Sequence, residues 1–222
     1  MKNRAHLQSL AIALLTAALV VSLTTADGHA AKIRKNTERS KLPPGELTDH
    51  ALGDKAIWKD KKLGELSVVV TAVKRDAVSR RRADGCSYDF FEGVWAAPAT
   101  KWKNCYGSSG TAKVARKGKS KLFPLKVGNS AKFSVKGKSK RAGKKASTWE
   151  ITRRCKVKGT ANVTVPAGRF DTYRIDCSDK WNSYRMYYSP ELRFPVLFFQ
   201  KPLKGKSGRR THTELVSLEP AK

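Results

Sequence analysis

The sequence is poor in the residues that most catalytic and metal sites need. Histidine occurs four times, and two of the four lie in the first thirty residues. The four cysteines, Cys86, Cys105, Cys155 and Cys177, include no Cys-x-x-Cys pair and have no histidine near them in the sequence. Because the spacing of zinc ligands is missing, we expect neither a metal site nor a cofactor.

Long apolar runs are also missing after the first thirty residues. There, Lys2 and Arg4 precede the apolar run Leu10 to Leu23, and small residues follow it. This pattern predicts a secretory signal peptide over residues 1–30, cleaved after Ala26 or Ala30. The alternative is an uncleaved anchor helix, but the run is shorter than the roughly 20 residues that a spanning helix needs. We therefore expect a periplasmic or secreted protein with no transmembrane segment after processing.

An even number of cysteines in an exported chain predicts disulfides. Four cysteines allow three connectivities, and the sequence leaves all three open. Pairing between neighbours, Cys86 with Cys105 and Cys155 with Cys177, is the one that suits a chain of hairpins.

The rest of the chain divides at about residue 50. Residues 31–50 are polar and contain Pro43-Pro44-Gly45, which predicts a flexible linker. Residues 51–222 contain short β-branched and aromatic runs and no long stretch of period 3.6. We expect a disulfide-linked, all-β domain there, an antiparallel sandwich or open barrel built of hairpins. The expected strands are 66–73, 132–135, 147–157, 161–165, 170–175, 183–188, 196–199 and 212–218.

A weak internal repeat suggests two halves, 51–124 and 125–219. LGDKAIWK at 52–59 is similar to VGNSAKFS at 127–134, and a cysteine pair follows each of them. Chance similarity in a chain rich in Lys and Gly is the alternative.

The most regular segment is VTVPAGRFDTYRIDC, residues 163–177. Odd-numbered positions from Trp149 to Cys177 are mostly apolar and even-numbered positions, including Thr172, are mostly polar. This alternation predicts a hairpin with one buried face. A turn centred on Pro166 would place Cys155 opposite Cys177, whereas a bulge near 158–160 would change that pairing. Asp171 and Arg174 are then expected to be surface partners, not a working site.

The same segment resembles a pattern found in exported bacterial envelope proteins of unknown function. The pattern is a VPAG-x-F-x-x-Y hairpin followed by a YYSPEL-like strand, here 187–192, and a final strand like THTELVSL, here 211–218. VGNSAKF at 127–133 matches the strand that precedes it. The resemblance implies a β-rich fold and an envelope location and implies no catalytic residue. The basic stretch 136–145 and the apolar FPVLFF at 194–199 depart from the pattern.

Acidic residues are scarce, and none lies between Glu92 and Glu150. The formal net charge of the chain is +28, which favours anionic partners. We expect Lys-rich mobile loops in this interval that bind an anionic envelope polymer or lipid surface, and no nucleic acid because the chain is exported. Trp102 could stack on such a ligand, or it could cover a disulfide. The alternative for the charges is a solvated surface without a ligand. The predicted ligand-binding residues are Lys113, Arg116, Lys117, Lys119, Lys121, Lys136, Lys138, Lys140, Arg141, Lys144, Lys145 and Trp102.

Two other hypotheses belong to different functional classes. FPVLFF could be an exposed strand that recruits a protein partner in an assembly, although a buried central strand is the simpler interpretation. His212 and Glu214 fall on one face of a strand, as an acid–base pair of a secreted hydrolase would. The sequence favours a non-catalytic binding protein of the bacterial envelope over both. It does not indicate an oligomeric state.

Overall fold

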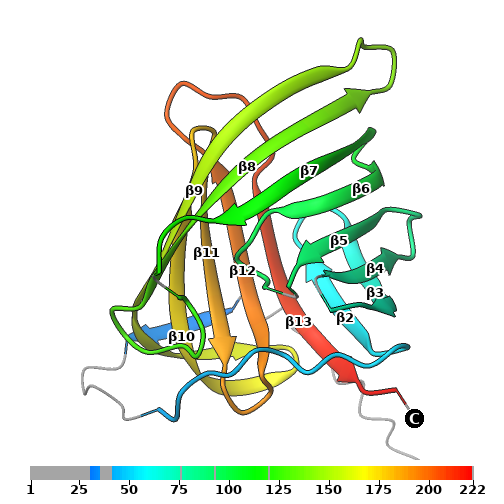
Figure 1. Cartoon of the computed structure of the whole chain (residues 1–222). Coiled ribbons are helices and arrows are strands. Elements are labelled where there is room, and N and C mark those ends of the chain that lie inside the picture. Colours follow the sequence, from blue (N-terminus) through cyan, green and yellow to red (C-terminus); the bar gives the residue numbers. More distant parts are fainter. Residues whose placement is uncertain (1–30, 36–41, 76, 93, 120, 222) are drawn as a thin grey trace, which may run out of the picture.

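The chain folds into a closed antiparallel β-barrel (Figure 1). The computed structural model describes residues 31–35, 42–75, 77–92, 94–119 and 121–221. Strands β2 to β13 pair in chain order, β13 returns to β2, and β8 pairs with β9. The strands are β1 (Lys32–Lys35), β2 (Lys55–Asp60), β3 (Gly64–Val73), β4 (Ala77–Arg82), β5 (Ser87–Phe91), β6 (Ala99–Cys105), β7 (Ser108–Arg116), β8 (Ser130–Arg141), β9 (Ser147–Val165), β10 (Gly168–Ser178), β11 (Asn182–Ser189), β12 (Phe194–Pro202) and β13 (Thr211–Glu219). The all-β antiparallel prediction is confirmed. The sandwich and the open barrel are wrong because the sheet closes on itself.

The predicted signal peptide, residues 1–30, lies outside the described residues. Within the part of the chain that the structure describes, no helix has the length and apolar character needed to cross a membrane.

The barrel wall follows the alternation of the sequence. In β8, Ala131, Phe133 and Val135 are buried, and their neighbours Lys132 and Lys136 are exposed. Apolar side chains therefore fill the interior while lysines cover the outside, as the period-2 pattern of a strand requires.

The β9–β10 hairpin has the predicted disulfide but not the predicted register. Its turn lies between Val165 and Gly168, whose φ is 133°, and these two residues are paired. A register shift between Arg174 and Ile175 then places Cys155 opposite Cys177. Because the shift changes which side chains of β10 point inward, Thr172 is fully buried, contrary to the prediction of a wet even-numbered face. Asp171 accepts a hydrogen bond from the Asn162 side chain at the surface.

Both disulfides join neighbouring strands. Cys86 pairs with Cys105 next to the β5–β6 ladder, and Cys155 pairs with Cys177 between β9 and β10. The pairing between sequence neighbours is confirmed. Each bond fixes two adjacent strands of the wall to each other.

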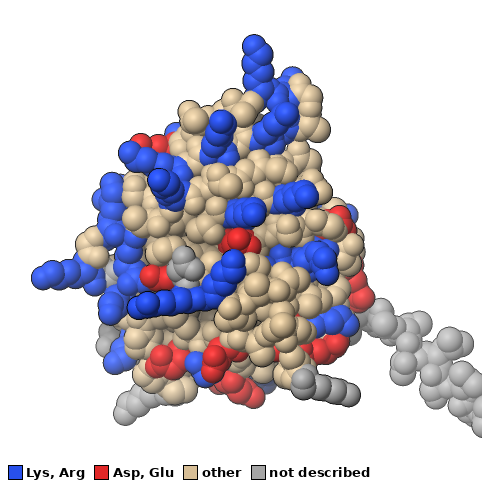
Figure 2. Space-filling view, turned by 45° about the vertical axis from the view of Figure 1, so that its right-hand side comes forward, with Lys and Arg blue, Asp and Glu red and all other residues tan. Residues whose placement is uncertain are grey.

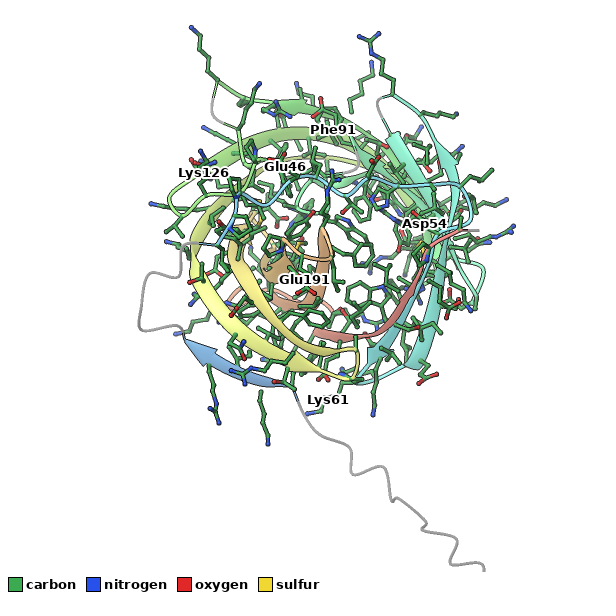
Figure 3. The ribbon with its side chains drawn as sticks, turned by 90° about the horizontal axis from the view of Figure 1, so that it is seen from below. Glu46, Asp54, Lys61, Phe91, Lys126 and Glu191 are labelled. Atoms are coloured by element: carbon green, nitrogen blue, oxygen red, sulfur yellow. A yellow bond between two sulfur atoms is a disulfide. The ribbon has the colours of Figure 1, made fainter. Side chains whose placement is uncertain are left out.

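Residues 31–50 were expected to form a flexible linker, and their described part instead packs on the barrel. Strand β1 pairs with residues 161–164 of β9. Residues 42–54, here called the strap, cross the lower end of the barrel as oriented in Figure 1; Figure 3 shows Glu46 and Asp54 on it from below. Gly45 exchanges two backbone hydrogen bonds with Leu125, and the Tyr188 hydroxyl donates to the Glu46 carbonyl. Residues 36–41 lie outside the described residues.

The loop between β5 and β6 enters the barrel above the strap. Its residues Val94, Ala96 and Ala97 are almost fully buried. Beside this loop, buried Arg80 packs its guanidinium on the Trp95 ring at 4.0 Å and lies 2.7 Å from His50 Nε2. Burial and the charge of Arg80 lower the pKa of His50 to about 4. The lower end of the barrel is thus closed by packing from inside and by the strap from outside.

The two proposed halves correspond to β2–β7 and β8–β13, six strands each. The similar stretches 52–59 and 127–134 lie at the start of β2 and of β8, the first strands of these halves. The disulfides, however, occupy different ladders in the two halves. The repeat therefore stays a prediction.

Candidate functional site: a basic groove on the outer wall

A groove of about 1320 Å³ crosses the outer face of β8 to β13, with Ile33 of β1 along it. The β9–β10 hairpin makes the groove concave, since its end reaches β13, where the Ala167 amide donates to the Leu215 carbonyl. Its lining includes ten Lys and Arg residues and a single acid, Asp176. The ten are Lys61, Lys62, Lys117, Lys132, Arg154, Lys156, Lys158, Arg185, Lys201 and Arg210.

The strand register sets these cations in rows across the wall. One row runs from Lys156 through Asp176, Arg185 and Phe199 to His212, each residue opposite the next. Strands lie about 4.8 Å apart, so the charges of one row are near neighbours. In this row Asp176 lies between Lys156 and Arg185, so the charges alternate and Asp176 offsets one of the two cations.

A second row brings two like charges together. Lys132 of β8 is paired directly with Arg154 of β9. Like charges in directly opposed positions destabilise a sheet. Among the described residues that line the groove, Asp176 is the single acid, and its charge is paired with two other arginines rather than with Lys132 or Arg154.

Asp176 is neutralised by arginines. Its carboxylate oxygens lie 2.6 Å from Arg174 Nη2 and 2.9 Å from Arg185 Nε. Burial raises its pKa, but the hydrogen bonds and charges of the two arginines outweigh burial and hold the pKa below its usual range. The carboxylate therefore stays charged without leaving a free negative charge to repel an anion.

His212 and Glu214 form a close pair at the edge of the groove. His212 Nε2 lies 2.9 Å from Glu214 Oε1, and the imidazole packs on Phe199 with 4.5 Å between ring centroids. Glu214 is buried and also accepts a hydrogen bond from the Ala31 amide. The hydrogen bond from Ala31 holds the residue before β1 to β13, a structural role that the hydrolase hypothesis did not foresee. Among the described residues, no group of three His, Cys, Asp or Glu could hold a metal.

Of the predicted ligand-binding residues, Lys117 alone lines the groove. Lys136, Lys138 and Lys140 point outward from β8 and continue the line of Lys132, forming a ladder of exposed lysines. Lys113 of β7 is directly opposite Lys136, whose ammonium lies 3.6 Å from Glu150. These residues were expected in mobile loops. That expectation is wrong because the Gly and Ser between them are the inward positions of β8.

The remaining predicted residues are dispersed. Lys119 and Lys121 lie in the β7–β8 connection, and Arg116 is bound to Glu92 at 2.6 Å. Arg141 ends β8, and Lys144 and Lys145 lie in the turn that follows. The structure therefore does not gather the predicted set into one site.

Trp102 is separated from all of these cations by the barrel wall. It points inward from β6, directly opposite Gly110, and its indole N–H donates to Ser108 Oγ. A ligand on the outer lysines cannot stack on this ring. The prediction that joined Trp102 to the basic residues is wrong.

The apolar segment FPVLFF forms the start of β12. This strand pairs with β11 on one side and β13 on the other, and Phe194, Val196 and Leu197 are buried. The buried central strand is confirmed. The backbone of residues 197–199 is paired on both sides and cannot take a partner strand, which contradicts recruitment through that part of the segment.

Sequence reasoning missed most of the groove. Arg154, Lys156 and Lys158 occupy every second position of β9, so the alternation marked them as outward cations. Arg185 and Lys201 were missed because only the pairing of β10 with β11 and of β11 with β12 brings them to the same face of the wall as the cations of β9.

Charge is also uneven on the rest of the surface. Figure 2 shows acidic side chains mostly at the lower end of the face it presents, and Lys and Arg over the remainder. The strap contributes Glu46, Asp49 and Asp54 to that lower end. On this face the charge is therefore uneven from the lower end upward.

The solved structures that are similar to this chain include the following two. One is the hypothetical lipoprotein YmcC from Escherichia coli K12, at 9% identity and a TM-score of 0.48, covering 78% of this chain and 91% of that one. The other is a protein with a YmcC-like fold from Bacteroides fragilis NCTC 9343, at 12% identity and a TM-score of 0.37, covering 79% and 99%. Likeness at this level carries no argument about function. No protein-family model and no curated protein matches the chain.

Proposed function

We propose that this is an exported, non-catalytic binding protein that holds an anionic polymer in the outer basic groove. The observation that carries the proposal is the lining of the groove, ten cations around one neutralised acid. Two disulfides support export, because they form and persist in oxidising compartments.

The arrangement favours an extended polyanion over a small anion. The cations lie on four strands, β8, β9, β11 and β12, and in the connections β2–β3, β7–β8 and β12–β13, and the exposed ladder of β8 extends the groove along the barrel. Lysine predominates over arginine, which suits general charge attraction better than bidentate recognition. Such binding releases counterions and weakens steeply as salt rises.

Retention on heparin-agarose in a salt gradient tests the proposal. We compare Lys156→Gln/Lys158→Gln/Lys201→Gln in the groove with the control Lys74→Gln/Lys101→Gln/Lys103→Gln. All six lysines are exposed, and each triple removes the same charge. The groove triple should elute at clearly lower salt, and its slope of log affinity against log salt should fall by about 2–3 because each contact contributes about 0.7–0.9. The control should change little. An equal loss of heparin affinity in both triple variants would show that binding depends on net charge alone and would overturn the proposal that the groove is the binding site.

A further inference from the structure

The barrel interior contains a second candidate site. A cavity of about 460 Å³ lies above the β5–β6 loop, with Ala96, Ala97 and Pro98 at its floor. It extends toward the upper end of the barrel, where Tyr106 and Trp181 line it. This size is within the range of pockets that bind small ligands.

The lower part of the cavity is apolar. Leu66, Ile151, Ile175, Met186 and Phe198 project into it from five different strands. Burial of an apolar group here would contribute about 25 cal/mol for each Å² removed from water. This part offers little to a sugar or a nucleotide, both of which need many polar partners.

Tryptophans form much of the cavity wall, and two of them lie against the strand backbone because each faces a cross-strand glycine. Trp102 and Trp149 are directly opposite glycines, Gly110 and Gly137, and a Cβ on either glycine would lie within 2.4 Å of the indole ring. The two rings, 6.2 Å apart, lie over the strand backbone and leave the space in front of them open. All five tryptophans of the chain line the cavity.

Buried arginines stand at the polar end of the cavity. Arg153 donates to Asp179 at 3.0 Å and to the Tyr184 hydroxyl at 2.7 Å. Burial raises the pKa of Asp179, but Arg153 and two backbone amides outweigh it and keep the pKa low, so this pair is ionic. Arg82 is held by Asp84 and the Tyr106 hydroxyl. The Nε–H groups of Arg82 and Arg153 are buried and make no hydrogen bond within the described part of the chain.

Two further cations lie beyond these arginines. Lys180 Nζ lies 4.7 Å from the centroid of the Trp181 ring. Arg209 packs on Tyr106 at 4.0 Å, and its charge is balanced by an ion pair with the buried carboxylate of Asp60 at 3.3 Å. From floor to rim, the lining of the cavity therefore changes from apolar side chains to buried Nε–H donors without acceptors among the described residues, and then to a positively charged side chain.

We propose that the cavity binds a single-chain amphiphile with an anionic head group. Its apolar chain occupies the space between the tryptophans and the floor. Its head lies at the polar end of the cavity beside Arg82 and Arg153, whose Nε–H groups lack acceptors among the described residues. This site is separated from the outer groove by the barrel wall and does not depend on the polymer hypothesis.

The tryptophans provide the measurement. Titrating the protein, with both disulfides formed, with 12-bromododecanoate should quench tryptophan emission in a saturable way, since bromine quenches only at short range. Dodecanoate and dodecyl phosphate should reverse the quenching by displacing the probe. Dodecan-1-ol should need a concentration about ten times higher for the same reversal. Absence of saturable quenching would overturn the site, and equal competition by dodecan-1-ol would overturn the role of the anionic head.

Two variants localise the binding. Thr213 lines the cavity, so Thr213→Phe should fill it and weaken quenching at least tenfold. Thr111→Phe makes the same change at an exposed position of β7 and should leave quenching unchanged. Arg82→Gln should weaken the binding of dodecanoate about tenfold and the binding of dodecan-1-ol hardly at all. The loss of the Arg82 charge should not disrupt the fold, because its partner Asp84 is half-exposed and can be hydrated. The groove triple should bind the probe as wild type does. Equal effects of Thr213→Phe and Thr111→Phe would place the probe outside the cavity.

Discussion

The contact between Gly137 and Trp149 gives the sharpest test of the barrel wall. A Cβ at position 137 would lie 2.3 Å from Trp149 Cζ2, whereas ordinary contacts begin near 3.4 Å. In Gly137→Ala the indole must therefore move by about 1 Å or more, and its hydrogen bond to Ser139 Oγ, now 3.2 Å, is strained or lost.

The expected loss of stability follows from three terms. Overpacking costs about 1–3 kcal/mol, and a lost hydrogen bond costs about 1 kcal/mol. Replacing glycine by alanine in a strand recovers about 0.5–1 kcal/mol of backbone entropy. Gly137→Ala should therefore lower the free energy of unfolding by about 2–3 kcal/mol and shift the urea midpoint, measured by far-ultraviolet circular dichroism, to lower concentration.

A double-mutant cycle provides the control. In a Trp149→Leu background the clash is absent, so Gly137→Ala should be neutral or stabilising there. A coupling of at least about 2 kcal/mol between the two positions is expected. If Gly137→Ala is as stable as the wild type while Trp149 is present, the indole does not lie on this glycine and the reasoning fails.

Three further outcomes are expected from other parts of the fold. The pKa of His50 is about 4 in the folded state and about 6.5 in the unfolded state, so unfolded chains bind more protons between these pH values. The free energy of unfolding should therefore fall by about 1–2 kcal/mol from pH 6.5 to pH 4, after allowance for the partial exposure of the imidazole. In urea melts, His50→Gln should remove that part of the pH dependence. Cys155→Ala/Cys177→Ala opens a loop of sequence separation 22 and should cost about 3 kcal/mol; equal urea midpoints with and without this disulfide would contradict it. Tyr188→Phe removes the hydroxyl that holds the strap and should cost about 1–2 kcal/mol and speed hydrogen exchange in residues 42–54, and unchanged exchange there would argue against the strap contact.

The cysteine pairing shows how far local pattern can reach. The alternation of β9 and β10 predicts a turn centred on Pro166, and a regular ladder that starts from this turn would place residue 155 opposite residue 177. The turn is displaced by one step, with Val165 paired to Gly168, and the bulge before Ile175 displaces the ladder back. The disulfide was predicted correctly because two deviations cancel. Thr172, which lies between them, was predicted on the wrong face for the same reason.

The basic residues show the opposite case. The scarcity of acids between Glu92 and Glu150 is visible in the sequence, and so is the alternation of Lys132, Lys136, Lys138 and Lys140. What the sequence did not show is that Gly137 and Ser139 between them are inward positions of a strand. Glycine and serine favour loops in isolation, but here they make room for Trp149 from the neighbouring strand. A cross-strand requirement outweighed local preference.

By itself, the sequence determined the strand class and the excess of positive charge, and it favoured disulfides between neighbouring cysteines, because alternation and composition are local properties. Only the tertiary structure decided that the sheet closes, that Trp102 and the lysines lie on opposite sides of one wall, and that residues 42–54 cover its lower end. Closure depends on the pairing of β13 with β2, a contact between residues far apart in the chain whose register includes a shift between Leu215 and Ser217 and is set by packing across the interior.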